Sequence, residues 1–205
     1  MIIEKGLNIY VPPTTKYIGT LEVGHCSIIG NFNDSQELKT NTAEIVNIGK
    51  NLKIGAFCKI SNNVTIGNDC MIGDNCQIYH TTTIGDNVII ETGSRVSARC
   101  RIGNNVIISG LVSQRVVMED NVRYLGRIAH IHYNSTLDWK TTSEPSPIFR
   151  KGCVIGVNAL IIGDVEIGEN AYIAAGEIVR CNIPPDSVYY KGKIHKKEFF
   201  RGIIV

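Results

Sequence analysis

The sequence predicts an all-β protein, a parallel β-helix of six-residue repeats with one long loop excursion. Three observations predict it. A large aliphatic residue recurs at every sixth position through most of the chain, a smaller residue stands two positions before it, and Gly, Asn or Asp follow it. A period of six is not the 3.6-residue period of an amphipathic helix, so we expect short strands joined by regular corners.

The six-residue step is unbroken from Ile48 to Ile108. Its large members are Ile48, Ile54, Ile60, Ile66, Ile72, Ile78, Ile84, Ile90, Val96, Ile102 and Ile108. The smaller residues two positions before the later members are Leu52, Cys58, Val64, Cys70, Cys76, Thr82, Val88, Ser94, Cys100 and Val106. Residues two positions apart in a strand point to the same side, so both sets are predicted to point inward.

The corners between strands have their own residue types. Glycine often follows the large aliphatic residue, as at Gly49 and Gly85, and Asn51 and Asn87 come two positions later. These residue types tolerate left-handed backbone angles, so the chain can turn there. Three strands and three corners would close a triangular coil of about 18 residues, and successive coils would stack about 4.8 Å apart.

Most cysteines follow the repeat. The small inward position holds five of the seven: Cys58, Cys70, Cys76, Cys100 and Cys153. We interpret them as compact buried hydrophobic residues rather than as disulfide partners or metal ligands. No Cys-x-x-Cys motif occurs, and Cys26 and Cys181 fall outside the pattern.

The whole chain, 1–205, is predicted to form a single β-helix domain that interruptions of the repeat divide. The predicted parts are an N-terminal cap with the first turns (1–47), the main coils (48–130), a loop that we expect to carry the functional site (131–148), the final coils (149–183) and a C-terminal tail (184–205). After Ile108 the phase slips and resumes as Met118, Tyr124 and His130, which predicts an inner-pillar position for His130. The smaller inner partners expected there are Val116, Val122 and Ile128.

Size and charge exclude several classes of protein. The 205 residues are enough for one sizeable core, and the net charge of +2 is spread along the chain, which argues against nucleic-acid binding. No apolar run approaches the length of a membrane span, and the N-terminus lacks the features of a signal peptide. We therefore expect a cytoplasmic protein that binds neither nucleic acid nor membranes.

The motif Ile84-Gly85-Asp86-Asn87 resembles the repeat of the hexapeptide-repeat acyltransferases, and the resemblance covers nearly the whole chain. Residues 150–159 and 167–171, with the loop before them, are most similar to nucleotide-sugar N-acyltransferases of bacterial surface-polysaccharide pathways. The resemblance implies a left-handed coil, a homotrimer, and transfer of an acyl group from acyl-CoA, acetyl-CoA above all, to the amine of a nucleotide-linked amino sugar. One departure is Tyr189-Tyr190-Lys191-Gly192-Lys193, where relatives often have a Gly-x-Pro-Ala stretch beside the CoA adenine.

In such enzymes acyl-CoA would lie along the last coils, between subunits. Small residues would let the pantetheine approach the backbone, and basic residues would pair with the CoA phosphates. The predicted cofactor-binding residues are Arg150, Lys151, Ala159, Ala174, Ala175, Lys191 and Lys193. Simple coil geometry explains the small residues, and solvation explains the lysines, at least equally well.

Acyl transfer needs a group that takes up a proton, and histidine titrates near neutrality. His130 and His132 stand at about the point where related enzymes place a catalytic histidine. We expect His132 to act as the base or to orient the acceptor, with His130 as the second candidate. The His130-x-His132 pair could also chelate zinc, but no third histidine at a suitable spacing is evident beyond His80 of a neighbouring subunit, and we predict no metal site.

The loop also supplies candidates for the acceptor site. An aromatic ring could stack on a nucleotide base, and a carboxylate could hold a sugar hydroxyl or ammonium group. The predicted acceptor-binding residues are His80, Tyr133, Asn134, Asp138, Trp139 and Glu144. Trp139 could instead anchor the loop to its own β-helix. Two alternative functions remain open, O-acetylation of a sugar or small alcohol and a non-catalytic role as a binding or assembly module.

Overall fold

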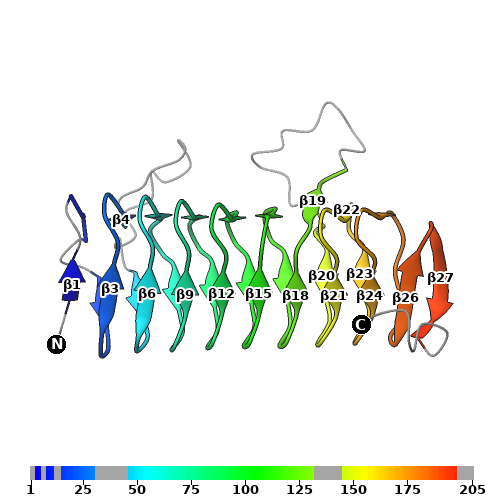
Figure 1. Cartoon of the computed structure of the whole chain (residues 1–205), viewed down its shortest axis with the longest axis horizontal. Helices are drawn as coiled ribbons and strands as arrows, with labels where there is room; N and C mark the ends of the chain where they lie inside the picture. The colour runs from blue at the N-terminus through cyan, green and yellow to red at the C-terminus, as the bar shows by residue number, and fades with distance from the viewer. Residues whose placement is uncertain (1–2, 6–7, 12–14, 31–45, 132–144, 198–205) are drawn as a thin grey trace.

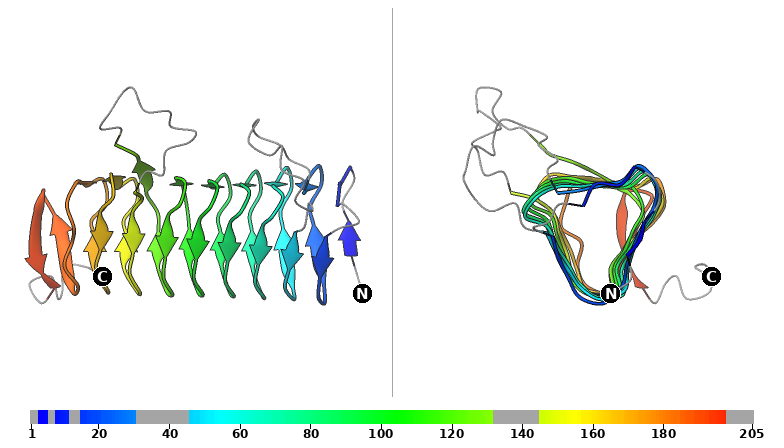
Figure 2. Two further views of the ribbon diagram at one scale, coloured as in Figure 1. Left: turned by 180° about the vertical axis from the view of Figure 1, so that it is seen from behind. Right: turned by 90° about the vertical axis from the view of Figure 1, so that its left-hand side faces the viewer.

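A computed structural model describes residues 3–5, 8–11, 15–30, 46–131 and 145–197. They form a long triangular prism built from three parallel β-sheets that run along its length (Figures 1 and 2). The chain visits the sheets in a fixed order, sheet I, then sheet II, then sheet III, and then returns to sheet I one coil further on. The all-β, parallel β-helix prediction is confirmed.

Almost every strand is two or three residues long, as a six-residue repeat requires. Sheet I contains β1 (Ile3–Lys5), β3 (Leu21–Val23), β6 (Leu52–Ile54), β9 (Met71–Ile72), β12 (Ile89–Ile90), β15 (Ile107–Ile108), β18 (Arg123–Tyr124), β21 (Val154–Ile155), β24 (Tyr172–Ile173), β26 (Ser187–Tyr190) and β27 (Lys193–Lys196). Sheet II contains β4 (Ile28–Ile29), β7 (Lys59–Ile60), β10 (Gln77–Ile78), β13 (Arg95–Val96), β16 (Leu111–Val112), β19 (Arg127–Ala129), β22 (Leu160–Ile162) and β25 (Ile178–Val179). Sheet III contains β2 (Lys16–Tyr17), β5 (Asn47–Ile48), β8 (Thr65–Ile66), β11 (Thr83–Ile84), β14 (Arg101–Ile102), β17 (Val117–Met118), β20 (Ile148–Phe149) and β23 (Glu166–Ile167).

The coil is left-handed. In Figure 1 the N-terminus is on the left, the strands of sheet I run upward on the near side, and the chain then crosses the top in sheet II and descends behind in sheet III. The end-on view of Figure 2 shows the same circuit as a triangle, counter-clockwise as the chain moves away from the viewer. This agrees with the handedness that the resemblance implies.

Inside the prism the two inward residue sets form continuous stacks. Register pairs the pillar residues of successive coils directly, for example Ile78 with Val96 and Ile84 with Ile102. All the large and small members of the pattern between residues 48 and 108 are buried, including the polar Thr82 and Ser94. The interior is therefore one continuous buried core along the prism.

The five patterned cysteines are buried in this core, whereas Cys26 and Cys181 are exposed, and all seven are free thiols. Burial raises the pKa of both Cys100 and Cys153 to about 12, so these thiols stay protonated. The predicted burial of the five patterned cysteines at the small inward position is confirmed.

The corners use the predicted left-handed backbone. Asn51 and Asn87 have φ values of 56° each. The glycines that precede such corners answer a different need, because a Cβ on Gly49 would lie 2.6 Å from the carbonyl carbon of Gly67 in the next coil. Backbone of adjacent coils approaches too closely there for any side chain.

The prediction that His130 lies on the inner pillar is wrong. Ile128 in β19 pairs with Ile161 and is buried, so Ile128 holds the pillar position and His130 follows the end of the strand. The cause is a shortened corner at Gly126, which leaves the successive pillar residues Tyr124 and Ile128 four positions apart instead of six.

A second shortened corner, at Gly110, explains the earlier slip of the phase. Ile108 and Val112 are successive pillar residues four positions apart, and Val96 pairs with Val112. These compact coils also contain a larger side chain, Tyr124, whose ring packs edge-on against Phe149 at 5.5 Å between centroids. The buried Tyr124 hydroxyl donates a hydrogen bond to the carbonyl oxygen of Leu111 at 2.8 Å.

The C-terminal end of the prism is closed by a hairpin. After the two prolines, β26 still pairs in parallel with β24, and β27 then folds back antiparallel on β26. The carboxylate of Glu177 accepts hydrogen bonds from the backbone N–H groups of Lys191 and Gly192, at 2.6 and 3.1 Å, and so holds the hairpin turn. In the described part of the chain, no helix has the length and apolar character that crossing a membrane would take.

Candidate functional site

The edge between sheets II and III, called here the II–III edge, gathers the histidines of interest. The second residue after each pillar residue of sheet II lies at this edge, coil after coil, and in the central coils these residues are Asn62, His80, Ala98, Gln114 and His130. His80 and His130 therefore lie in one column. They are three coils apart, roughly 14 Å at the usual strand spacing, so one chain does not bring the two rings together.

The same edge is where the repeat is interrupted. Residues 31–45 connect β4 of sheet II to β5 of sheet III, and residues 132–144 connect β19 of sheet II to β20 of sheet III. Several predicted site residues lie in the second segment and so fall outside the described residues: His132, Tyr133, Asn134, Asp138, Trp139 and Glu144. Their roles stay predictions.

His80 is held close to the coil. Its side chain is 8% exposed, and Nδ1 lies 3.2 Å from Oγ1 of Thr81. Its carbonyl oxygen accepts a hydrogen bond from the backbone N–H of Arg99 in the next coil, at 3.0 Å. Such a histidine is positioned by its neighbours, which suits an orienting group better than a mobile one.

His130 lies at the base of the long segment, half-buried, immediately after β19. The preceding residue, Ala129, is fixed because its carbonyl oxygen accepts a hydrogen bond from the N–H of Gly163 at 3.0 Å. On the far side of the segment, the hydroxyl of Ser146 donates to the carbonyl oxygen of Gln114 at 2.8 Å. Both ends of residues 132–144 are therefore attached to ordered coils, with His130 at one end.

The predicted cofactor-binding residues do not form one cluster in a single chain. Arg150 follows β20 in sheet III, and its guanidinium contacts Glu119 Oε1 and Glu166 Oε1, each at 2.8 Å. These contacts raise the pKa of Arg150 and lower those of both carboxyl groups below 4.5. The next residue is the exposed Lys151, whose backbone N–H donates a hydrogen bond to Glu119 Oε2 at 2.9 Å.

The remaining predicted cofactor residues lie elsewhere. Ala174 and Ala175 follow β24 in sheet I, and Lys191 and Lys193 lie in the C-terminal hairpin. Ala159 is fully buried at a small inward position, so its side chain cannot contact a cofactor. Ala174 lies beside this hairpin, because its backbone N–H donates to the carbonyl oxygen of Tyr189 at 3.0 Å. The small residues and Lys191 are therefore neighbours in one chain, whereas Arg150 and Lys151 lie apart from them, after β20 in sheet III.

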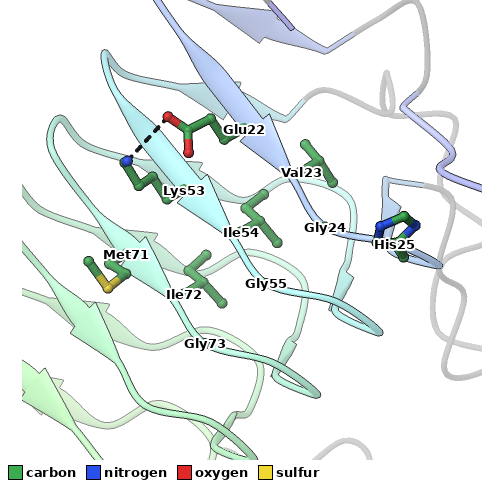
Figure 3. A pocket seen from close by; sticks show the side chains of 10 residues that line it. All are labelled: Glu22, Val23, Gly24, His25, Lys53, Ile54, Gly55, Met71, Ile72 and Gly73. Atoms are coloured by element: carbon green, nitrogen blue, oxygen red, sulfur yellow. Dashed lines mark ion pairs between the residues drawn. The ribbon is translucent and has the colours of Figure 1, made fainter. Parts of the chain in front are cut away.

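A shallow groove of about 550 Å³ opens on sheet I near the N-terminal end (Figure 3). Gly24, Gly55 and Gly73 form its floor in successive coils, and Glu22 and Lys53 form an ion pair of 3.2 Å at its side. His25 lies at one end of the groove. The groove contains none of the predicted catalytic residues, so we do not assign it the acceptor.

Two arginines at the II–III edge were not among the predicted site residues. Arg99 and Arg115 occupy the corner position itself, with φ values of 63° and 60°. A signal for them exists in the sequence, because the third residue after each sheet II pillar residue reads Asn63, Thr81, Arg99 and Arg115 in successive repeats. A bulky basic residue is disfavoured in the left-handed backbone conformation that suits Asn, and such disfavoured positions concentrate at functional sites.

Among the described residues, no group of three or more His, Cys, Asp or Glu side chains is arranged to hold a metal ion. His132 lies outside the described residues, so the zinc alternative at His130 and His132 stays a hypothesis.

Two families of repeats match the chain. Residues 45–80 match the family described as bacterial transferase hexapeptide (six repeats). Residues 63–98 and 151–181 match the family described as hexapeptide repeat of succinyl-transferase. The matched segments are coils of the prism on either side of residues 132–144.

Similar proteins of known function include serine acetyltransferases. One from Salmonella typhimurium is 35% identical over 77 residues, which is 37% of this chain and 26% of that protein. One from Buchnera aphidicola is 52% identical over 40 residues, 20% of this chain and 15% of that protein. The chain thus spans about a quarter or less of the length of these relatives.

Similar solved structures are acyltransferases. A mutant of AntD, an N-acyltransferase from Bacillus cereus in complex with dTDP and coenzyme A, has a TM-score of 0.39 and 18% identity, covering 65% of this chain and 72% of that one. The UDP-N-acetylglucosamine acyltransferase of Francisella novicida has a TM-score of 0.29 and 17% identity, covering 99% and 74%. Likeness at this level says nothing of what this chain binds. The matched segments coincide with coils of the prism, and these segments are similar to hexapeptide repeats of bacterial transferases.

Proposed function

We propose that the protein is an acyl-CoA-dependent acyltransferase that acylates the amine of a nucleotide-linked amino sugar. The observation that carries the proposal is the match of its coils to acetyltransferases, at 35% identity over 77 residues, in a chain whose histidines His80 and His130 lie along one edge. We further propose a homotrimer with acyl-CoA as co-substrate and no metal, acting in the cytoplasm, where acyl-CoA is available.

In this reaction the amine nitrogen attacks the thioester carbonyl carbon, the carbon–sulfur bond breaks, and CoA leaves as the thiol. The proton lost by the amine passes to a histidine, which returns it to the departing sulfur. His132 is the first candidate for this base and His130 the second. His80, held against the coil by Thr81, would orient the acceptor of its own or a neighbouring subunit. Backbone N–H groups at the coil edge would stabilise the oxyanion.

The cofactor would contact the last coils and hairpin of one subunit, with Lys151 supplied by a neighbouring subunit. Lys151, Lys191 and Lys193 are exposed and would pair with CoA phosphates. Ala174 and Ala175 would let the pantetheine approach the backbone. Arg150 would contribute only in part, because its guanidinium already contacts two carboxylates.

The test is release of CoA thiol from acetyl-CoA with a panel of nucleotide-linked amino sugars, compared with L-serine and with simple amino sugars. We expect turnover with a nucleotide-linked amine and a loss of about 100-fold or more in kcat for His132→Ala or His130→Ala. The matched control is His195→Ala, a histidine in the C-terminal hairpin, which should leave kcat unchanged. If no amine or alcohol of the panel leads to release of CoA thiol, the proposal is contradicted and a non-catalytic β-helix module is favoured.

O-acylation is the second candidate, because the matched serine acetyltransferases bear a name that denotes transfer to serine. A hydroxyl needs stronger base assistance than a neutral amine. If the acceptor is a hydroxyl, the histidine variant should lose turnover at every pH. If the acceptor is an amine, turnover should recover partly as the pH rises and the amine deprotonates.

A further inference from the structure

In the coils from residue 59 to residue 131, the II–III edge and the two faces beside it carry charge of one sign, whereas the next coil carries Asp164 and Glu166 there. Residues 59–66, 77–84, 95–102, 111–118 and 127–131 form these faces in successive coils and contain no Asp or Glu. The same stretches carry six cationic side chains: Lys59, Arg95, Arg99, Arg101, Arg115 and Arg127. We call these six residues the basic strip.

The edge between sheets III and I carries negative charge instead. It carries Asp69, Asp86, Glu119 and Asp120 in the same coils. The near-neutral total of +2 therefore hides a separation of charge across the prism. A surface with one sign of charge raises the local concentration of ligands of the other sign.

Within the basic strip, Arg99 and Arg115 stack in successive coils. The backbone N–H of Arg115 donates to the carbonyl oxygen of Ala98 at 3.0 Å, just as that of Arg99 donates to His80, so Arg115 takes the position of Arg99 one coil on. Their backbones are about 4.8 Å apart. Like charges in neighbouring strands destabilise one another unless an anion lies between them.

Arg101, Arg115 and Arg127 form no ion pair with any described residue, whereas Arg150 on the far side of sheet III contacts two carboxylates. Arg95 lies over the ring of Tyr79 at 4.6 Å from its centroid, which fixes one guanidinium beside the edge. The guanidinium groups of Arg101, Arg115 and Arg127 therefore retain donors for an external ligand.

Backbone strain points the same way. An arginine in the left-handed region is disfavoured relative to Asn or Gly, yet two successive corners of this edge hold one, at φ values of 63° and 60°. Strained positions of this kind concentrate at functional sites.

We propose that the basic strip binds a diphosphate group, with Arg115 and Arg101 as principal ligands and Arg99 and Arg127 beside them. Two adjacent phosphoryl groups match two guanidinium groups carried by adjacent coils, and each guanidinium can donate two parallel hydrogen bonds to one phosphoryl group. This inference goes beyond the proposed function and rests on it only for the source of the diphosphate, since nucleotide sugars and CoA both contain one. It also places that group beside the histidine column.

The experiment is calorimetric titration of the full chain with inorganic pyrophosphate, without any acyl donor. We expect the double variant Arg101→Gln/Arg115→Gln to bind pyrophosphate at least 10-fold more weakly than the parent. The matched control is Arg123→Gln, which removes one exposed arginine from the outer face of sheet I and should bind pyrophosphate as the parent does. Equal losses in the double variant and the control, or no pyrophosphate binding by the parent, would overturn the proposal.

Competition then identifies the source. Displacement of pyrophosphate by UDP or dTDP but not by CoA assigns the strip to the acceptor, and displacement by CoA alone assigns it to the acyl donor. Because binding is measured without turnover, pyrophosphate binding in a protein that releases no CoA thiol would refute the proposed function and leave the strip intact.

A second variant separates ligand binding from folding. Arg115→Asn removes the charge but suits the left-handed backbone, so it should raise the thermal midpoint while weakening pyrophosphate binding. A purely structural role for Arg115 would instead leave pyrophosphate binding unchanged.

Discussion

At two edges of the same prism the chain turns through a corner residue with positive φ, but the residue types at these corners differ. At the edge between sheets III and I, called here the III–I edge, the corner residues with positive φ are Gly19, Asn51, Asp69, Asn87, Asn105, Asn121, Gly152, Asn170 and Asp186. At the II–III edge, the corresponding residues include Thr81, Arg99 and Arg115. The III–I edge has the residue types that a left-handed backbone favours, whereas the II–III edge has Thr and Arg, which it disfavours. These disfavoured residues lie beside the two histidines and both interruptions of the repeat.

Side chains at the III–I edge also bond to one another along the prism. Asn68 donates from its backbone N–H and its side-chain amide to Asp86 Oδ1, at 2.7 and 3.0 Å, and Asp86 donates its N–H to Asn104 Oδ1 at 2.9 Å. Asn104 continues the ladder to Asp120. These side chains form hydrogen bonds within the protein and stabilise the stacking of the coils. Their structural role explains the residue types of the III–I edge without a ligand.

The largest expected effect tests how tightly the III–I edge is packed. Gly49→Ala places a Cβ 2.6 Å from Gly67 carbonyl carbon, so the stacked coils must separate. We expect a loss of about 3 kcal/mol in the free energy of unfolding, measured by urea denaturation. Gly93→Ala is the control, because nothing lies within 4 Å of the new Cβ and only its φ of 76° opposes it, at about 1 kcal/mol. Equal losses would mean that backbone conformation, not coil contact, requires glycine at Gly49.

A reciprocal exchange tests the comparison directly. Asn105→Arg puts arginine into the left-handed backbone of the III–I edge, at a φ of 56°, and should cost about 1 kcal/mol of unfolding free energy. Arg115→Asn at the II–III edge should gain about the same amount. Thermal unfolding of both variants checks the signs. If both exchanges destabilise the protein, Arg115 makes stabilising contacts and the functional explanation of this corner loses its main support.

The smallest effect concerns the ion pairs that Arg150 makes near the III–I edge. The pKa values of Glu119 and Glu166 lie below 4.5, first because each accepts hydrogen bonds from Arg150. Lowered carboxyl pKa values stabilise the folded state above the unfolded pKa, and this contribution is lost as the pH falls through the folded pKa values. Arg150→Gln should therefore lower the thermal midpoint slightly at pH 7, and the difference from the parent should shrink as the pH falls below about 4.

Lys53→Gln is the control for that measurement, since it breaks a single exposed pair with Glu22 at 3.2 Å. It should change the thermal midpoint less than Arg150→Gln does. A difference for Arg150→Gln that persists unchanged at pH 3 would show that lost packing of the arginine stem, rather than its charge, accounts for the effect.

The sequence predicted the regular coils well because their rule is local. Each inward residue is specified by its neighbours two and six positions away, and the buried cysteines such as Cys100 follow the same rule. The candidate site was predicted less completely. The pattern could locate His130 near the interruption, but it placed the ring on the inner pillar because the corner at Gly126 is two residues shorter than a six-residue repeat requires.

By itself, then, the sequence determined the triangular coil, its inner pillars and the corners of the III–I edge, because a six-residue period and Asn or Gly corners are properties of short segments. Only the tertiary structure decided that His80 and His130 share one column and that Arg99 and Arg115 stack beside it. Those alignments depend on the summed lengths of all the coils between them, and one shortened corner shifts every later residue against the coils already stacked.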